Sequence, residues 1–168
     1  LVLRDEGAGE LLPAANAVIL DEAHQLPETA SLFFGESIST AQLLELARDA
    51  RAAALQHARD FSPLPPATQA LEKCARDLRL ECGDLPGRMP ARMFEGRTPF
   101  AHALAATRSA LDTLGELLAM QAERSADIDH CRQRAAAAGM RLQAWCEGEE
   151  AERVRWVEVL AEAAGLKT

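Results

Sequence analysis

An acidic pair and a nearby histidine follow a short apolar run close to the start of the chain. The run Ala-Val-Ile-Leu over residues 17–20 is followed directly by Asp21, Glu22, Ala23 and His24. A short apolar run with β-branched residues is typical of a buried strand in a parallel sheet. Side chains just beyond the carboxyl end of such a strand lie where open α/β sheets bind ligands. One carboxylate there could hold Mg²⁺, and the next could orient or deprotonate an attacking water, as nucleotide hydrolysis requires.

The same residues also have a simpler interpretation. An Asp-Glu pair after a strand is commonly a helix N-terminus, and short motifs produce false positives. A histidine such as His24, in the first turn after a strand, is often only a surface residue. The chemistry of these side chains alone therefore leaves both interpretations open.

The wider string over residues 12–28, LPAANAVILDEAHQLPE, resembles the Walker B region of the DinG/YoaA/XPD family. These are superfamily 2 DNA helicases with an iron–sulfur cluster, and the bacterial YoaA-like branch is nearest. A second, shorter likeness covers residues 154–158. The resemblance implies an ATP-dependent 5′–3′ helicase of DNA repair or replication. It implies that Asp21 helps to hold the Mg²⁺ of MgATP, that Glu22 is the catalytic carboxylate, and that His24 couples the nucleotide site to a second motor domain.

Two parts of such a motor are missing from this sequence. The chain has ten glycines, but none lies in a G-x-x-x-x-G-K-[ST] motif, so the loop that binds the triphosphate is absent. No sequence remains for a second motor domain with its arginine finger. We therefore expect the chain to be a piece of a larger helicase, and we expect this piece alone not to hydrolyse ATP.

The composition favours a helical domain. The 168 residues are enough for one domain with a real core. Aromatic residues make up 4%, Tyr is absent and Ala is abundant, a bias toward helix. The formal net charge of −8 does not attract nucleic-acid phosphates. No apolar stretch approaches the ~20 residues that span a membrane, and no positively charged segment precedes an apolar one, so we expect no signal peptide. We expect a cytoplasmic setting without a membrane partner.

The four cysteines are predicted to be free thiols on helices. They form no C-x-x-C pair, so metal-ligand spacing is absent. In the family that the chain resembles, the cluster cysteines lie upstream of the DEAH box, whereas all four here lie downstream. The resemblance implies an iron–sulfur cluster in the parent protein, and the spacing of these cysteines predicts none in this chain. The four residues are Cys74, Cys82, Cys131 and Cys146.

Beyond the DEAH box the sequence has helical periodicity. A short helix is expected over residues 27–35. Ser39 and Gln42 form a capping-box start, and Thr98-Pro99 has the pattern of an N-cap followed by Pro at the first helical position. A second long helix restarts after a break at residues 61–66. The expected apolar positions are Leu43, Leu46, Ala47, Ala50 and Ala54; Ala67, Ala70, Leu71, Cys74 and Leu78; Phe100, Leu104, Thr107, Leu111, Leu114 and Leu118; and Ile128, Cys131, Ala135, Ala138, Leu142 and Trp145. We interpret these stripes as the core of a bundle.

Between and after these helices, three segments break the pattern. Residues 83–97 carry three Gly and two Pro and are predicted to be a loop, and a helix break is expected within residues 121–127. Residues 153–159 alternate and predict a strand, which would be the best partner for the strand at residues 17–20. A two-stranded remnant leaves open edges, so fraying or pairing with another chain is expected there.

The predicted fold is therefore mainly α, a helical bundle with flanking strands from an α/β RecA-like motor domain. The family inserts a helical arch domain into its first motor domain after the DEAH box. By that resemblance, residues 1–27 are a motor-domain segment, residues 28–150 the arch, and residues 151–168 the strand returning to the motor domain. A stand-alone four-helix protein with a chance DEAH does not explain the strand signals at both ends.

Two roles remain open for the helical part. In the family the arch helps to frame the path of single-stranded DNA, and Arg88, Arg92 and Arg97 are the best candidates for phosphate contact. The same arginines could equally belong to a solvated loop. Alternatively, an acidic bundle is chiefly a docking module for a replication or repair protein.

Overall fold

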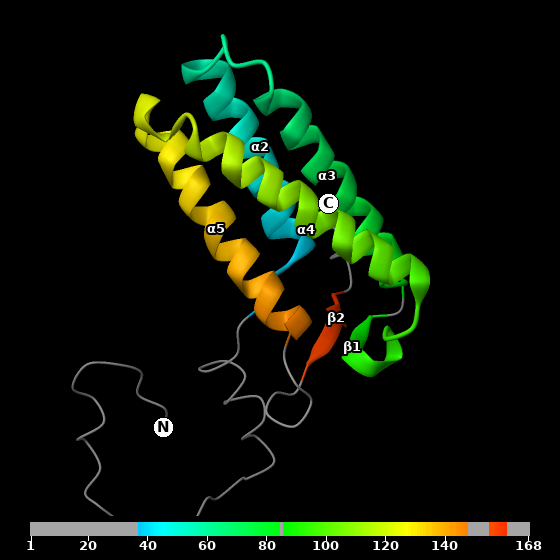
Figure 1. Cartoon of the computed structure of the whole chain (residues 1–168). Coiled ribbons are helices and arrows are strands. Elements are labelled where there is room, and N and C mark those ends of the chain that lie inside the picture. The colour runs from blue at the N-terminus through cyan, green and yellow to red at the C-terminus, as the bar shows by residue number, and fades with distance from the viewer. Residues whose placement is uncertain (1–36, 85, 148–154, 161–168) are drawn as a thin grey trace, which may run out of the picture. The chain divides into compact units, whose positions relative to one another are not determined.

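The computed structural model describes residues 37–84, 86–147 and 155–160 of the chain (Figure 1). The strand predicted at residues 17–20, the DEAH box and the short helix predicted at residues 27–35 lie outside these ranges. The described part contains the elements α2 (Thr40–His57), α3 (Leu64–Glu81), β1 (Gly87–Pro90), η3 (Ala91–Met93), α4 (Thr98–Ala119), η4 (Ala122–Arg124), α5 (Ala126–Glu147) and β2 (Trp156–Val159).

The four α-helices of the described part form a closed bundle. Contacts join α2 to α3, α3 to α4, α4 to α5, and α5 back to α2, so each helix packs on two neighbours. Successive helices run in opposite directions, as short connections require (Figure 1). The mainly α bundle with short strands that the sequence predicts is confirmed.

Local sequence signals set most of the helix ends. The Ser39 side chain accepts a hydrogen bond from the backbone N–H of Gln42 at 3.2 Å, and the Gln42 side chain accepts one from the Ser39 N–H at 3.1 Å. This is the predicted capping box. Gly83 follows the end of α3 with φ +82°, a conformation that favours glycine. The predicted break within residues 121–127 contains η4 and Ser125.

The start of α4 differs from the prediction by one residue. Thr98 is the first helical residue rather than the N-cap, so Pro99 takes the second helical position. Arg97 is the N-cap, and its carbonyl accepts a hydrogen bond from the Ala101 N–H at 3.0 Å. Proline still fits here, because the first N–H groups of a helix have no intrahelical partner.

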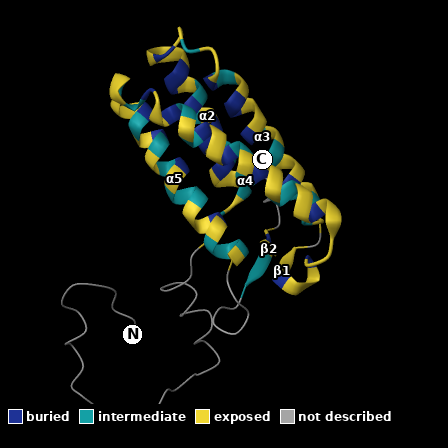
Figure 2. Ribbon diagram, in the orientation of Figure 1, coloured by how far each residue is buried: buried dark blue, intermediate teal, exposed yellow. Residues whose placement is uncertain are grey.

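The core follows the predicted stripes closely (Figure 2). All five apolar positions predicted for α2 are buried, and so are five of the six predicted for α4. Ala70 is the clear exception, because it is exposed on α3 while Ala75 and Thr68 are buried in its place. Four more predicted positions are only partly buried: Cys74, Leu104, Ala138 and Trp145.

The prediction that residues 83–97 are a loop was wrong in part. Residues 87–90 form β1, which pairs antiparallel with β2, with Gly87 opposite Val159 and Met89 opposite Val157. The predicted C-terminal strand is thus present at residues 156–159, but its partner in the described part is β1. Met89 and Val157 pack against a second apolar cluster built on Leu78, Phe94 and Phe100. We call residues 86–97 and 155–160 the sheet end.

Among the described helices, none combines the length and the apolar character that a membrane-spanning segment requires.

Candidate nucleic-acid interface

The three residues predicted for nucleotide chemistry, Asp21, Glu22 and His24, lie outside the described residues. Their roles stay predictions. The three arginines predicted for DNA contact lie within the described residues, all in the segment that carries β1 and η3.

Arg88 lies on the outer side of β1. It is opposite Glu158 in the strand register, and its Nε donates a hydrogen bond to Glu158 Oε1 at 3.2 Å. Its guanidinium lies 5.4 Å from the ring centroid of Trp156, a cation–π distance. About half of the side chain, 49%, remains exposed. Arg88 is therefore held in place by a charged and an aromatic partner while keeping donors open to solvent.

Arg97 and Arg92 follow on the same segment. The guanidinium of Arg97 lies 5.2 Å from the ring centroid of Phe94, which is itself buried. Arg92 belongs to η3 and is exposed, and it makes no hydrogen bond or ion pair with another described residue. The structure thus places all three predicted arginines at the surface of the sheet end.

Arg155, just before β2, is a fourth arginine of the sheet end that the sequence reasoning missed. Its Nη1 donates to the Trp145 carbonyl at 3.0 Å, and Nη2 lies 3.3 Å from Glu95 Oε1. The guanidinium also lies 5.7 Å from the Trp145 ring centroid. The side chain is only 16% exposed, so it supports this end rather than projecting from it. The alternating pattern over residues 153–159 was the signal that could have drawn attention to it.

The sheet end has a positive balance in an acidic chain. It contains four arginines and only two acidic residues, Glu95 and Glu158, whereas the whole chain has a formal net charge of −8. Arginines are suited to phosphate because the planar guanidinium can donate two parallel hydrogen bonds. Aromatic rings beside cationic side chains are also common in proteins that bind single-stranded nucleic acids. Chemically, this end can bind a phosphate backbone.

The four cysteines lie within the described residues and form no disulfide there. Burial raises the pKa of all four thiols, Cys74, Cys82, Cys131 and Cys146. Next to Cys82, Arg79 and Arg97 partly oppose that rise in the pKa. Within the described ranges no group of three or more His, Cys, Asp and Glu side chains could hold a metal ion.

Two known proteins are similar to this chain over nearly its whole length. The ATP-dependent DNA helicase YoaA of Escherichia coli K12 is 32% identical over 158 residues, which cover 94% of this chain and 25% of that protein. The protein of the same name from Haemophilus influenzae is 28% identical over 167 residues, or 99% of this chain and 26% of its own length.

The chain spans about a quarter of the length of these curated relatives. No family model matches it. No solved structure matches it either. The two alignments cover 94% and 99% of the chain, so the similarity extends over nearly all of its residues. The chain is therefore similar, over almost its whole length, to one region of the YoaA-like DNA helicases, consistent with a fragment of such a helicase.

Proposed function

We propose that this chain is the part of an ATP-dependent DNA helicase that carries the Walker B motif and the helical arch. The observation that supports this is the 94–99% coverage of the chain by two relatives named ATP-dependent DNA helicase. In this proposal residues 1–27 belong to a RecA-like motor domain, residues 28–150 form the arch, and residues 151–168 return to the motor sheet. The intact protein would move 5′–3′ on single-stranded DNA in repair or replication, in the cytoplasm, and would carry its iron–sulfur cluster outside this chain.

The proposed nucleotide chemistry rests on the DEAH segment. Asp21 would hold the Mg²⁺ of MgATP, because carboxylate oxygens suit this hard cation. Glu22 would position the attacking water and take its proton. His24 would transmit the state of the nucleotide site to the second motor domain. The phosphate-binding loop must come from elsewhere in the intact protein, so this chain alone would not turn over ATP.

The proposed DNA contact is the sheet end of the bundle. Arg88 and Arg97 are each stacked beside an aromatic ring, and Arg92 is exposed without a partner among the described residues. Contacts to phosphate depend on charge and fix the position of a strand, but carry no base specificity. The arch would therefore hold single-stranded DNA without regard to sequence.

The test replaces Arg88, Arg92 and Arg97 by Ala together in the intact helicase. We expect weaker binding to single-stranded DNA. The slope of log affinity against log salt concentration should also fall in magnitude by about 0.7 for each phosphate that is no longer neutralised by an arginine. Binding of ATP should not change, since none of these arginines belongs to the motif proposed to hold MgATP.

A matched control removes the same charge elsewhere. Arg59, Arg132 and Arg141 lie in the α2–α3 connection and on α5, and replacing these three by Ala should leave DNA affinity nearly unchanged. If the sheet-end variant binds and unwinds DNA as well as the wild type, the sheet end has no role in DNA binding.

The second candidate function is docking of a replication or repair protein. The formal net charge of −8 favours it, because an acidic surface repels DNA but suits a basic partner. A protein that co-purifies with the intact helicase, together with a sheet-end variant that still unwinds DNA normally, would favour docking over DNA contact.

A further inference from the structure

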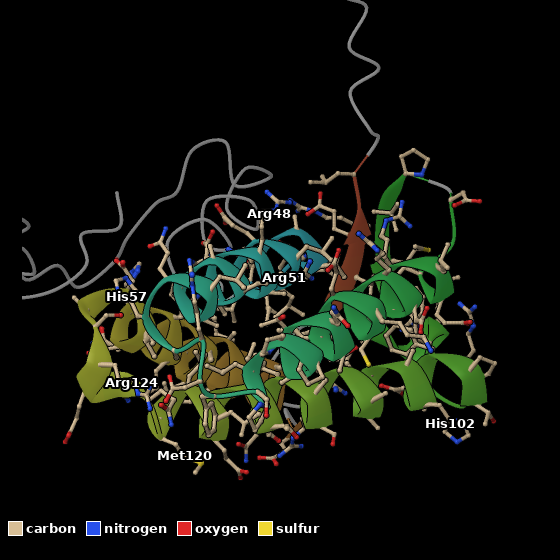
Figure 3. All side chains as sticks on the ribbon, turned by 90° about the horizontal axis from the view of Figure 1, so that it is seen from above. Arg48, Arg51, His57, His102, Met120 and Arg124 are labelled. Atoms are coloured by element: carbon tan, nitrogen blue, oxygen red, sulfur yellow. The ribbon has the colours of Figure 1, made fainter. Side chains whose placement is uncertain are left out.

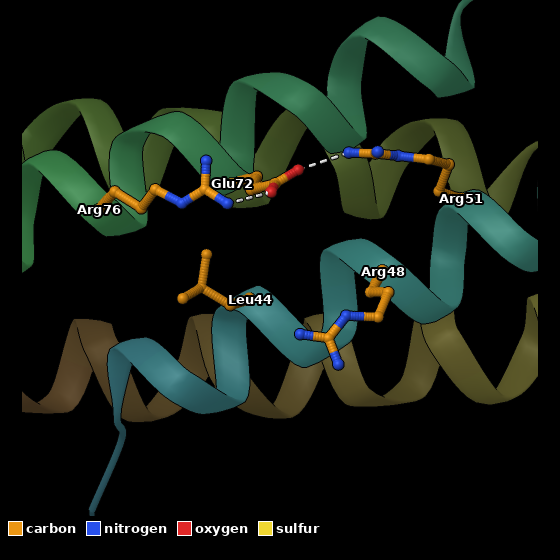
Figure 4. A pocket seen from close by; sticks show the side chains of 5 residues that line it. All are labelled: Leu44, Arg48, Arg51, Glu72 and Arg76. Atoms are coloured by element: carbon orange, nitrogen blue, oxygen red, sulfur yellow. Dashed lines mark hydrogen bonds and ion pairs between the residues drawn. The ribbon is translucent and has the colours of Figure 1, made fainter. Parts of the chain in front are cut away.

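A groove between α2 and α3 carries a second group of arginines. It is lined by Leu44, Arg48, Arg51, Glu72 and Arg76, and its cavity volume is about 150 Å³ (Figure 4). We call these five residues the arginine groove. Arg48 and Arg51 project from α2, one helical turn apart (Figure 3). The groove lies on the flank of the bundle and shares no residue with the sheet end.

One carboxylate serves two of the three arginines. Glu72 Oε2 lies 2.5 Å from Arg51 Nη2, and Glu72 Oε1 lies 2.6 Å from Arg76 Nη2 (Figure 4). Both oxygens of Glu72 are therefore engaged. Each guanidinium carries five N–H donors, so most donors of this pair remain without an acceptor from Glu72. The Nε of Arg51 is among these, since it is buried and has no hydrogen-bond partner.

Arg48 is the uncompensated charge of the groove. Its side chain is exposed, lines the cavity, and forms no ion pair with another described residue. Arg134 of α5, which faces the other flank of α2, shows the contrast: its Nη1 lies 2.5 Å from Asp49 Oδ2 and its Nη2 lies 3.7 Å from Glu45 Oε2, both carboxylates of α2. The acidic residues of α2 thus pair with an arginine of α5. On the flank of α2 that faces α3, the three arginines of the groove have only Glu72 as an acidic partner.

We propose that the arginine groove binds a phosphate of a DNA strand, which makes the flank of α2 and α3 a second DNA contact besides the sheet end. Leu44 makes one wall of the groove apolar. At the opposite wall, Glu72 holds the guanidinium groups of Arg51 and Arg76 in place. Arg48 then supplies a free guanidinium that can donate two hydrogen bonds to one phosphate. This inference rests on the proposed function, because it takes its ligand from a helicase's substrate.

The test is a charge reversal at Arg48 in the 168-residue chain. Arg48→Glu breaks no ion pair among the described residues, so the bundle should fold as before, which its circular dichroism and melting temperature would verify. Fluorescence anisotropy with a labelled single-stranded oligonucleotide then gives the affinity at several salt concentrations. We expect at least about a fivefold loss of affinity and a salt slope lower by about 0.7, the value for one phosphate contact on a single strand.

The control is Arg141→Glu on α5, which makes the same change in net charge at an exposed arginine outside the groove. Equal losses in both variants would overturn the proposal, because they would reflect only the total charge. The proposal would also be overturned if Arg48→Glu binds DNA as well as the wild type while the triple alanine variant of the sheet end binds weakly. That result would leave the proposed function unaffected. Absence of any salt-dependent DNA binding by the wild-type chain would overturn the groove as a DNA site. Competition by inorganic pyrophosphate that is lost in Arg48→Glu would support the phosphate as the recognised group.

Discussion

A carboxylate that activates water and an arginine that binds phosphate act through different properties of their side chains. In the proposed mechanism Glu22 would accept a proton, whereas Arg48, Arg88 and Arg97 would need only to remain charged and well placed. The arginines can therefore be tested by removing charge, but Glu22 has to be tested by a change that keeps its shape.

Glu22→Gln in the intact helicase makes that change. The amide keeps the size of the side chain but cannot take a proton, so ATP should still bind while hydrolysis falls by about 10²–10⁴-fold, the usual contribution of a positioned acid or base. Steady-state ATPase rates and equilibrium binding of a labelled nucleotide measure the two effects separately. An unchanged turnover number would exclude Glu22 as the catalytic group.

Among the secondary-structure elements, features set by neighbouring residues could be predicted from the sequence, whereas pairing between distant segments could not. The capping box at Ser39 and the apolar stripes of α2 and α4 involve residues within a few positions of each other, so the sequence predicts them directly. β1 has no such signal, since Gly87 and Pro90 are typical of loops and its hydrogen-bonding partner, β2, lies about 70 residues later. The local composition could not show this pairing.

The same reasoning explains which parts of the candidate sites could be foreseen. Arg88, Arg92 and Arg97 are close in sequence, and the sequence predicted them as a group. Arg155 joins them only because β2 pairs with β1, and the arginine groove exists only because α2 packs beside α3. Neither grouping can be inferred without the tertiary structure.

The capping box gives the prediction that belongs to this scale. Ser39→Ala removes the acceptor for the Gln42 N–H at the start of α2, and should lower the free energy of unfolding by about 1 kcal/mol. Urea denaturation measures it as a lower midpoint with an unchanged slope. Ser62→Ala is the control, because Ser62 is exposed and makes no hydrogen bond with a described side chain or backbone group. Equal effects of the two substitutions would mean that the box does not stabilise α2.

At the scale of the described molecule, two apolar clusters divide the structure. The larger one joins all four helices, and includes Leu111, Leu114 and Leu118 of α4. The smaller one, built on Leu78, Phe94 and Phe100, attaches the sheet to the bundle through Met89, Trp145 and Val157. Phe94 and Phe100 lie 4.8 Å apart between ring centroids. Because the sheet depends on the smaller cluster, it should open without unfolding the bundle.

Hydrogen exchange can test this division. The Ala91 N–H donates to the Arg155 carbonyl at 3.0 Å, and the alternation of antiparallel pairs places the Met89 N–H in the same ladder. In a chain that ends after residue 147, both amides should exchange at nearly unprotected rates, while Leu114 and Leu118 keep most of their protection, since core helices open only with global unfolding.

Val157→Ala is the milder companion to that truncation. It keeps both strands but removes part of the side chain that packs on the smaller cluster, so Met89 and Ala91 should lose part of their protection and Leu114 almost none. If Leu114 loses protection in step with Ala91 in either variant, the sheet and the bundle open together. The sheet end would then be an integral part of the core. A DNA strand bound there would stabilise the whole bundle instead of the sheet alone.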